Sequence, residues 1–190
     1  MTYQTVLDFW FGEPGAEVYG KARKEWFIKK PAFDAKIQQT FGDVLEHAID
    51  GKLDHWQNKP QSCLALVIVL DQFSRNLFRQ RPASFAQDSK ALKIAQGAIA
   101  RQFDQDLLPV QRVFFYLPFE HSEAIADQKE SLRLFTTLKG DPVCGSFVDY
   151  AQKHYDVIER FGRFPHRNAI LGRENTAAEE EFLKQPGSSF

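Results

Sequence analysis

The sequence predicts an all-α fold. Apolar residues recur every three or four positions through most of the 190 residues, and this is the period of an amphipathic helix. No stretch shows sustained alternation of apolar and polar residues, which is the pattern of a half-buried strand. Proline and glycine residues separate the periodic segments and mark short connections. We therefore expect one domain over residues 1–190, built from antiparallel helical hairpins.

Three helices are predicted in the first half of the chain. A short helix over Thr2–Phe11 ends before a glycine. Pro31 is suited to the first turn of the second helix, whose apolar residues repeat until Gly51, a typical C-terminal cap. Pro60 opens the third and most apolar helix, which we expect to end before Arg81 and the proline that follows it.

Two long periodic segments follow. The first covers Asp88–Phe103, with Asp88 suited to the N-cap position. The second begins at Pro109 and reaches Leu138. Within it, Pro118 lacks a backbone N–H and is expected to kink or break the helix, so that a new helix covers Glu120–Leu138.

The last long helix is predicted over Phe147–Phe161, with Gly162 as its cap. Beyond it, Thr176 and Glu179 have the spacing of a capping box, in which each side chain accepts a hydrogen bond from the other residue's backbone N–H. This motif predicts a short final helix that reaches Leu183.

Composition excludes several classes of protein. A net charge of −1 and a pI near 6.5 provide no global field for nucleic acid or an anionic membrane, so either partner would require a local surface. The longest apolar run, Leu64–Leu70, is far shorter than the ~20 residues of a membrane span. The N-terminal residues do not resemble a secretion signal, and two cysteines form no disulfide framework. We expect a cytoplasmic protein without a cofactor, a nucleic-acid partner or a membrane partner, and the sequence leaves its oligomeric state open.

The segment Leu64–Arg79 carries the first polar cluster. Its first half is apolar on all sides and should be buried, yet it runs directly into a group of polar side chains: Asp71, Gln72, Arg75 and Asn76. A buried carboxylate is costly unless it is paired. We therefore expect Asp71 to be buried and paired, either with Arg75 at i+4 or with an arginine of residues 160–167.

A second polar cluster follows Pro118. Glu120, Glu123 and Asp127 are expected on one helix face, with His121 beside them. Three carboxylates on one face raise the question of a metal site. The paired Glu-x-x-His motifs of dimetal bundles and the His-Glu-x-x-His motif are absent from the sequence, so we predict no metal site.

The third cluster lies at the end of the last long helix and in the loop after it. It comprises Arg160, Arg163, His166, Arg167 and Asn168. Arginine offers a rigid fork of donors that matches a carboxylate or phosphate, so this loop is a candidate anion receptor. The alternative is that these arginines only neutralise the carboxylates of the first two clusters.

Four segments resemble the signature stretches of an uncharacterised, mainly bacterial family catalogued as domain of unknown function 924. They are DFWFG at 8–12, LALVIVLDQFSRNLFR at 64–79, FFYLPFEHSEAIADQ at 114–128 and RFGRFPHRNAILGR at 160–173. The resemblance implies a tetratricopeptide-like array of helical hairpins and supplies no reaction. Ser74 stands where the resemblance leads us to expect proline, and this difference concerns helix bending.

Three functions remain open. The first is a helical binding protein with a charged internal cleft for an anionic small molecule or an acidic peptide. The second is an enzyme that performs acid–base chemistry on an anionic small molecule. The third is a structural ion-pair network without a ligand. The candidate acid–base residues are Asp71, Glu120, His121, Glu123 and His166. The candidate ligand-binding residues are Gln72, Arg75, Asn76, Asp127, Arg163, Arg167 and Asn168.

We expect the three clusters to meet in space, because none can be buried alone. The expected pairing matches four carboxylates (Asp71, Glu120, Glu123 and Asp127) with four arginines (Arg75, Arg160, Arg163 and Arg167). A functional site should leave some donors near His166 and Arg167 pointing into a cavity without a protein acceptor. A complete set of pairs, or clusters that touch without an adjoining pocket, would favour a structural role.

Overall fold

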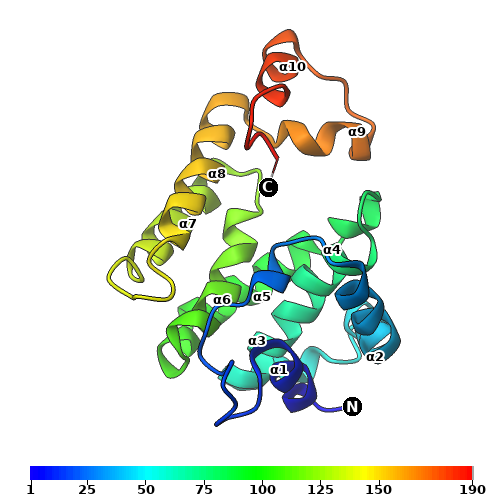
Figure 1. Cartoon of the computed structure of the whole chain (residues 1–190), viewed down its shortest axis with the longest axis vertical. Helices are drawn as coiled ribbons and strands as arrows, with labels where there is room; N and C mark the ends of the chain where they lie inside the picture. The colour runs from blue at the N-terminus through cyan, green and yellow to red at the C-terminus, as the bar shows by residue number, and fades with distance from the viewer. Residues whose placement is uncertain (190) are drawn as a thin grey trace.

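The computed structural model describes residues 1–189, and within that range the chain is all-α, with no strand (Figure 1). The α-helices are α1 (Tyr3–Phe11), α2 (Pro31–Ile49), α3 (Pro60–Ile68), α4 (Ser74–Leu77), α5 (Asp88–Ala100), α6 (Pro109–Glu120), α7 (Ile125–Thr136), α8 (Phe147–Phe161), α9 (Asn168–Leu171) and α10 (Ala177–Leu183). Short 3-10 turns join several of them. Those used below are η1 (Lys24–Trp26) and η6 (Pro165–Arg167).

Helices that follow one another in sequence pack side by side in the second half of the chain. Helix α5 contacts α6, α6 contacts α7, and α7 contacts α8. Helix α3 lies among α1, α5 and α6, and the segment between α1 and α2 crosses the surface of α6 (Figure 1). The all-α prediction is confirmed. The tetratricopeptide-like arrangement and the single domain stay predictions.

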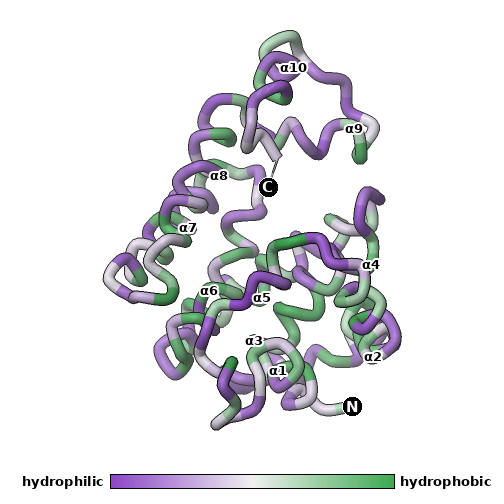
Figure 2. The backbone as a smooth tube through the Cα atoms, viewed as in Figure 1, coloured by the Kyte–Doolittle hydropathy of each residue, from purple (hydrophilic) through white to green (hydrophobic). Residues whose placement is uncertain are grey.

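The apolar core is centred on α3. All residues of Leu64–Leu70 are 0% exposed, and α3 is the most continuously hydrophobic helix in Figure 2. Trp10 of α1 packs beside it, with ring centroids 5.5 Å from Phe73 and 5.6 Å from Phe114. Trp26 is held against Trp10 by a hydrogen bond from its indole N–H to the Trp10 carbonyl oxygen. The two edge-to-face pairs of Trp10 with Phe73 and Phe114 each add about 0.5–1.5 kcal/mol beyond burial alone.

The central helix contains a π-helical turn, η3, over Val69–Phe73 between α3 and α4. The prediction of one helix from Pro60 to the residues before Arg81 implies regular α-helical spacing through this segment, and that spacing is wrong here. The wider turn inserts one residue, so side chains after it are displaced around the axis relative to a regular helix. Asp71 and Gln72, which lie within the turn, are 1% and 6% exposed. Turns of this type are frequent at functional sites.

Pro118 does not break its helix. It lies in the last turn of α6, which continues to Glu120, and α7 begins only at Ile125. Because proline has no N–H, the hydrogen bond to the carbonyl oxygen four residues earlier is missing, yet two more helical residues follow Pro118 in this buried part of α6. Consequently Glu120 ends α6, Glu123 lies in the connection and Asp127 lies in the first turn of α7. The prediction that they share one helix face is wrong.

The predicted helix ends are largely confirmed. Gly162 caps α8 with φ 68°, and Thr176 and Glu179 form the capping box of α10. Asp88 is the first residue of α5 rather than its N-cap, so its carboxylate is available for another partner. None of the helices in residues 1–189 combines the length and the apolar character of a membrane span.

Residues 164–183, which contain η6, α9 and α10, form a segment that we call the C-terminal arm. Its apolar contacts form a small cluster of its own with the end of α8, in which Phe164 packs against Val157 and Ile158. The arm lies at one end of the molecule and is mostly hydrophilic (Figures 1 and 2). Its other contacts with the rest of the protein include hydrogen bonds and ion pairs with Asp88, His121 and Glu123.

Candidate functional site

Asp71 lies at the centre of a buried network of charged residues. Its Oδ1 atom accepts a hydrogen bond from His121 Nδ1 at 2.7 Å and lies 3.1 Å from Arg75 NH1. Its Oδ2 atom accepts a hydrogen bond from Gln72 Nε2 at 2.6 Å. Both oxygens of this buried carboxylate are thus satisfied. The expected pairing with Arg75 is present, and His121 joins the second cluster to the first.

Asp88 extends the network to the third cluster. Arg75 donates to both Asp88 oxygens, at 2.8 and 3.1 Å, and Arg167 donates to Asp88 Oδ2 at 3.2 Å. The same Arg167 donates from NH2 to the His121 carbonyl oxygen at 3.0 Å. Residues from the central helix, from α5, from the end of α6 and from η6 therefore meet at one place.

Arg167 has an unusual environment for a guanidinium. The residue is 7% exposed and lies 4.6 Å from the ring centroids of both Phe85 and Phe164. Its Nε atom is buried and has no hydrogen-bond partner among residues 1–189. Burial and the neighbouring Arg75 lower the pKa of Arg167 to about 10, so the side chain is still charged near pH 7.

The two partners Asp71 and His121 have distinct protonation states. Burial alone would raise the pKa of Asp71, but Arg75 and His121 outweigh it and hold that pKa below its usual value. Burial and Arg75 lower the pKa of His121 despite the opposing pull of Asp71. A neutral His121 that donates from Nδ1 to an ionised Asp71 leaves Nε2 unprotonated. This nitrogen can accept a proton, in the manner of a carboxylate-oriented histidine base.

Glu120 is the only other buried carboxyl next to this pair in the described part of the chain. Burial raises its pKa to about 8, and the charge of Asp71 adds to the effect. Its Oε1 atom lies 3.3 Å from His154 Nδ1, whereas Oε2 is buried without a hydrogen-bond partner among residues 1–189. Near pH 7 this side chain is largely a neutral acid and can donate a proton.

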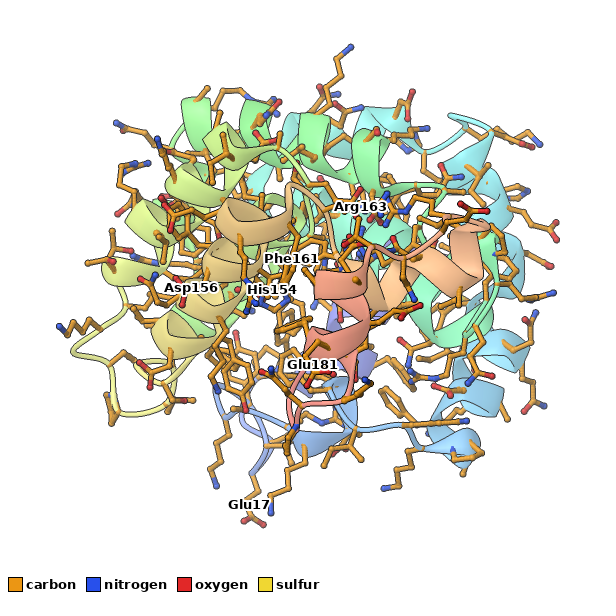
Figure 3. The ribbon with its side chains drawn as sticks, turned by 90° about the horizontal axis from the view of Figure 1, so that it is seen from above. Glu17, His154, Asp156, Phe161, Arg163 and Glu181 are labelled. Carbon is orange, nitrogen blue, oxygen red and sulfur yellow. The ribbon has the colours of Figure 1, made fainter. Side chains whose placement is uncertain are left out.

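His154 reaches Glu120 from α8 (labelled in Figure 3). Its Nδ1 donates to the Tyr150 carbonyl oxygen at 2.8 Å, and its ring packs edge-on against Phe164 at 5.5 Å. Burial lowers the pKa of His154 to about 3. His166 packs 5.5 Å from the same Phe164 ring, and burial lowers its pKa to about 4. Both histidines are therefore neutral near pH 7.

Glu123 ties the C-terminal arm to the connection after α6. It accepts two hydrogen bonds from Arg173, at 2.8 and 2.9 Å, and one from the Phe164 backbone N–H at 2.8 Å. Burial works against ionisation, but Arg173 and the Phe164 amide outweigh it and lower the pKa of Glu123. The expected arginine partner from residues 160–167 is replaced by Arg173.

Several predicted site residues lie outside the network. Arg163 binds Glu179 at 2.6 and 2.8 Å, so its predicted pairing with the carboxylates of the first two clusters is wrong. Arg160 stacks on its neighbour Phe161, at 4.7 Å, and shares no ion pair with those carboxylates. Arg163 and Phe161 are labelled near the end of α8 in Figure 3.

The remaining candidates have local polar partners. Asn76 donates a hydrogen bond of 2.7 Å to Asp34, and Asp34 also binds Arg79. Asp127 accepts from Ser122 at 2.6 Å, and Asn168 donates to Asn175 at 2.8 Å. These side chains stabilise turns and helix contacts around the network. The expected pairing of Asp127 with one of the four arginines is also wrong.

Two hollows lie on the surface, and neither has Asp71, His121 or Arg167 in its lining, so neither is the cavity expected beside the network. One is lined by Met1, Ala32, Ala35, Lys36, Gln39 and Thr40. The other is lined by Arg160, Phe161, Arg163, Thr176, Ala178 and Glu179. Among residues 1–189, no group of three or more His, Cys, Asp or Glu side chains is arranged to hold a metal ion.

Four residues of the network or its surroundings were missed from sequence. They are Phe85, Asp88, His154 and Arg173. His154 carried a signal, because it is a polar residue on the otherwise apolar face of α8 formed by Ala151, Val157 and Ile158. For Asp88 the sequence predicts only a role as a helix cap. The others have no local pattern that separates them from ordinary surface residues.

The fold and the network together define an all-α protein with a buried carboxylate–histidine–arginine site. The chain belongs to the family described as "Bacterial protein of unknown function (DUF924)", which it matches over residues 6–187. It is also similar to the solved structure of a protein of unknown function from Agrobacterium tumefaciens, with 40% identity, 97% coverage of each chain and a TM-score of 0.85. A comparison with curated proteins gave no match.

Proposed function

We propose that this chain is a helical binding protein that holds an anionic small molecule at the network around Asp71, with Arg167 as the anchoring residue. The observation that carries the proposal is the buried Nε atom of Arg167, which has no partner among residues 1–189. Buried polar atoms in folded proteins nearly always have a hydrogen-bond partner. A carboxylate or phosphate oxygen would supply one and would match the charge of the guanidinium.

The exposure of the network favours a small ligand over an acidic peptide. Asp71 and Arg167 have side chains that are only 1% and 8% exposed, so an extended peptide would not reach them. The side chains of Arg75, Asp88 and His121 are 19%, 18% and 13% exposed. These three residues are more exposed than Asp71 and Arg167, so on this proposal a compact ligand would enter beside them.

Charge balance predicts that binding is linked to protonation. Three carboxylates, Asp71, Asp88 and Glu123, pair with three arginines, Arg75, Arg167 and Arg173. A bound anion therefore adds an uncompensated negative charge. Protonation of His121 would compensate it, so affinity should rise as the pH falls below the usual histidine range.

A thermal-shift screen tests the proposal. The panel contains small mono- and dicarboxylic acids, inorganic phosphate and phosphate monoesters, each against the wild-type protein. A ligand present at about 100 times its dissociation constant stabilises the native state by about 2.7 kcal/mol, which is readily seen as a higher melting temperature. No shift with any member at millimolar concentration would leave the network as a structural ion-pair cluster.

A second candidate, acid–base catalysis, is favoured by one specific observation. Glu120, with a pKa of about 8, and His121, oriented by Asp71, are a proton donor and a proton acceptor in the same network. If the protein is an enzyme, a bound compound should be recovered chemically changed from the wild type. It should be recovered unchanged from Glu120→Gln, which keeps the shape of the site. A pure binding protein returns the compound unchanged in both cases.

A further inference from the structure

A short apolar segment lies exposed between η1 and α2. Phe27 and Ile28 are 51% and 57% exposed, which is unusual for neighbouring large apolar residues. The ring of Phe27 is nevertheless positioned, with its centroid 5.5 Å from Phe147 of α8 and 6.2 Å from Trp26. The Phe27 side chain is therefore held in place by packing against these aromatic rings.

Three exposed lysines flank this pair: Lys24, Lys29 and Lys30. None of the three has an ion pair with a residue in 1–189. The nearest carboxylates are already engaged, because Glu25 binds Arg23 at 2.7 Å and Asp34 binds Arg79 at 2.6 Å. The lysines therefore give a local positive surface on a chain whose net charge is −1. The N-terminus of α2, which begins at Pro31, adds to the positive potential.

We infer that the segment Lys24–Lys30 is a docking surface for an anionic lipid interface. Exposed aromatic and aliphatic side chains enter the boundary between headgroups and acyl chains, and lysines beside them pair with anionic headgroups. An acidic peptide would share the charge but would need a groove for its side chains. Neither surface hollow described above includes Phe27 or Ile28 in its lining. The contact is peripheral, and it is independent of the proposed ligand site.

Vesicle flotation tests this inference with the full-length protein. The probes are vesicles of phosphatidylcholine alone and vesicles with about 30% phosphatidylglycerol, at low and at high salt. We expect binding to the anionic vesicles only, and release by about 0.5 M salt because the Debye length then falls to a few ångströms. Equal binding to both kinds of vesicle, or binding to neither, overturns the inference.

Variants identify the surface. Lys29→Gln/Lys30→Gln should lower the partition coefficient roughly 30-fold, because each lysine near an anionic leaflet contributes about fivefold. Ile28→Ser should lower it several-fold and leave the fold intact, since the side chain is mostly exposed. The matched control, Lys93→Gln/Lys129→Gln, removes two exposed lysines on α5 and α7 and should bind like the wild type. Equal loss in the control overturns the assignment, as does binding to poly-glutamate in place of anionic vesicles.

Discussion

Asp71, inside the π-helical turn, accepts a hydrogen bond of 2.7 Å from His121, which lies 50 positions later in the sequence. The bond links the most buried helix to the end of α6. Because Asp71 is 1% exposed, its negative charge depends on His121, Arg75 and Gln72 for stabilisation. This relationship places Asp71 at the centre of both the stability and the chemistry of the network.

Replacing Asp71 by Ala should lower the free energy of unfolding by about 3–5 kcal/mol, because Arg75 and His121 would lose the partner that compensates their burial. Asp88 still binds Arg75, and this places the expected value at the lower end of the range. Urea unfolding followed by circular dichroism measures the change. Asp43→Ala on the exposed face of α2 is the control, with little expected effect. A decrease in the free energy of unfolding of less than about 1 kcal/mol for Asp71→Ala would mean that water reaches the site and solvates its charges.

Glu120→Gln should change how stability depends on pH. The folded-state pKa of about 8 exceeds the usual value of 4.5, so the native state binds a proton that the unfolded chain releases between these two values. The wild type should therefore lose stability as the pH rises from about 5 to 8. Gln carries no charge at any of these values, and the variant should lack that loss, which amounts to at most about 5 kcal/mol since one pKa unit corresponds to about 1.4 kcal/mol.

The measurement is urea unfolding of both proteins at pH 5, 6.5 and 8. The two curves should be similar at pH 5 and diverge toward pH 8, with the variant the more stable. Glu46→Gln on the exposed face of α2 is the matched control and should follow the wild type. Parallel pH profiles for Glu120→Gln and the wild type would mean that Glu120 is ionised in the folded state.

Glu123→Gln should loosen the C-terminal arm without unfolding the core. The change weakens the ties to Arg173 and to the Phe164 amide, while the apolar cluster around α3 is untouched. Hydrogen exchange followed by mass spectrometry should show faster exchange for residues 164–183 and unchanged protection for α3. The control is Glu130→Gln, which breaks a surface pair with Arg133. Uniform loss of protection over the whole chain would contradict a separately tied arm.

The helices of this fold could be predicted from the sequence because their signals are local. Apolar spacing, the capping box at Thr176 and the glycine after α8 depend only on neighbouring residues. The π-helical turn at Val69–Phe73 was not predicted, since its residues fit a regular helix equally well and tertiary packing decides between the two. The continuity of α6 through Pro118 was not predicted for a related reason, because all residues from Val113 to Glu120 are buried, and the tertiary packing around them is not visible in the local sequence.

The site could be predicted only in part. Burial of Asp71 followed from the apolar run before it, and its pairing with Arg75 followed from their i+4 spacing. The choice among arginines could not be predicted, because Arg163 and Arg173 lie in the same segment and have the same charge. In the folded protein Arg163 pairs with Glu179, and Arg173 pairs with Glu123. The sequence predicts only a cap at Asp88, because capping depends on neighbouring residues. The pairing of Asp88 with Arg167 depends on tertiary structure and has no local signal.

The most direct test of the proposed function is isothermal titration of the best anion from the screen into three proteins. These are the wild type, Arg167→Gln and Arg163→Gln. Arg167→Gln should weaken binding by about 10-fold or more, because a hydrogen bond to a charged group contributes about 1.5–3 kcal/mol. Arg163→Gln should bind like the wild type, since Arg163 is engaged with Glu179. Unchanged affinity in Arg167→Gln, or equal loss in both variants, would contradict Arg167 as the anchor of a ligand site.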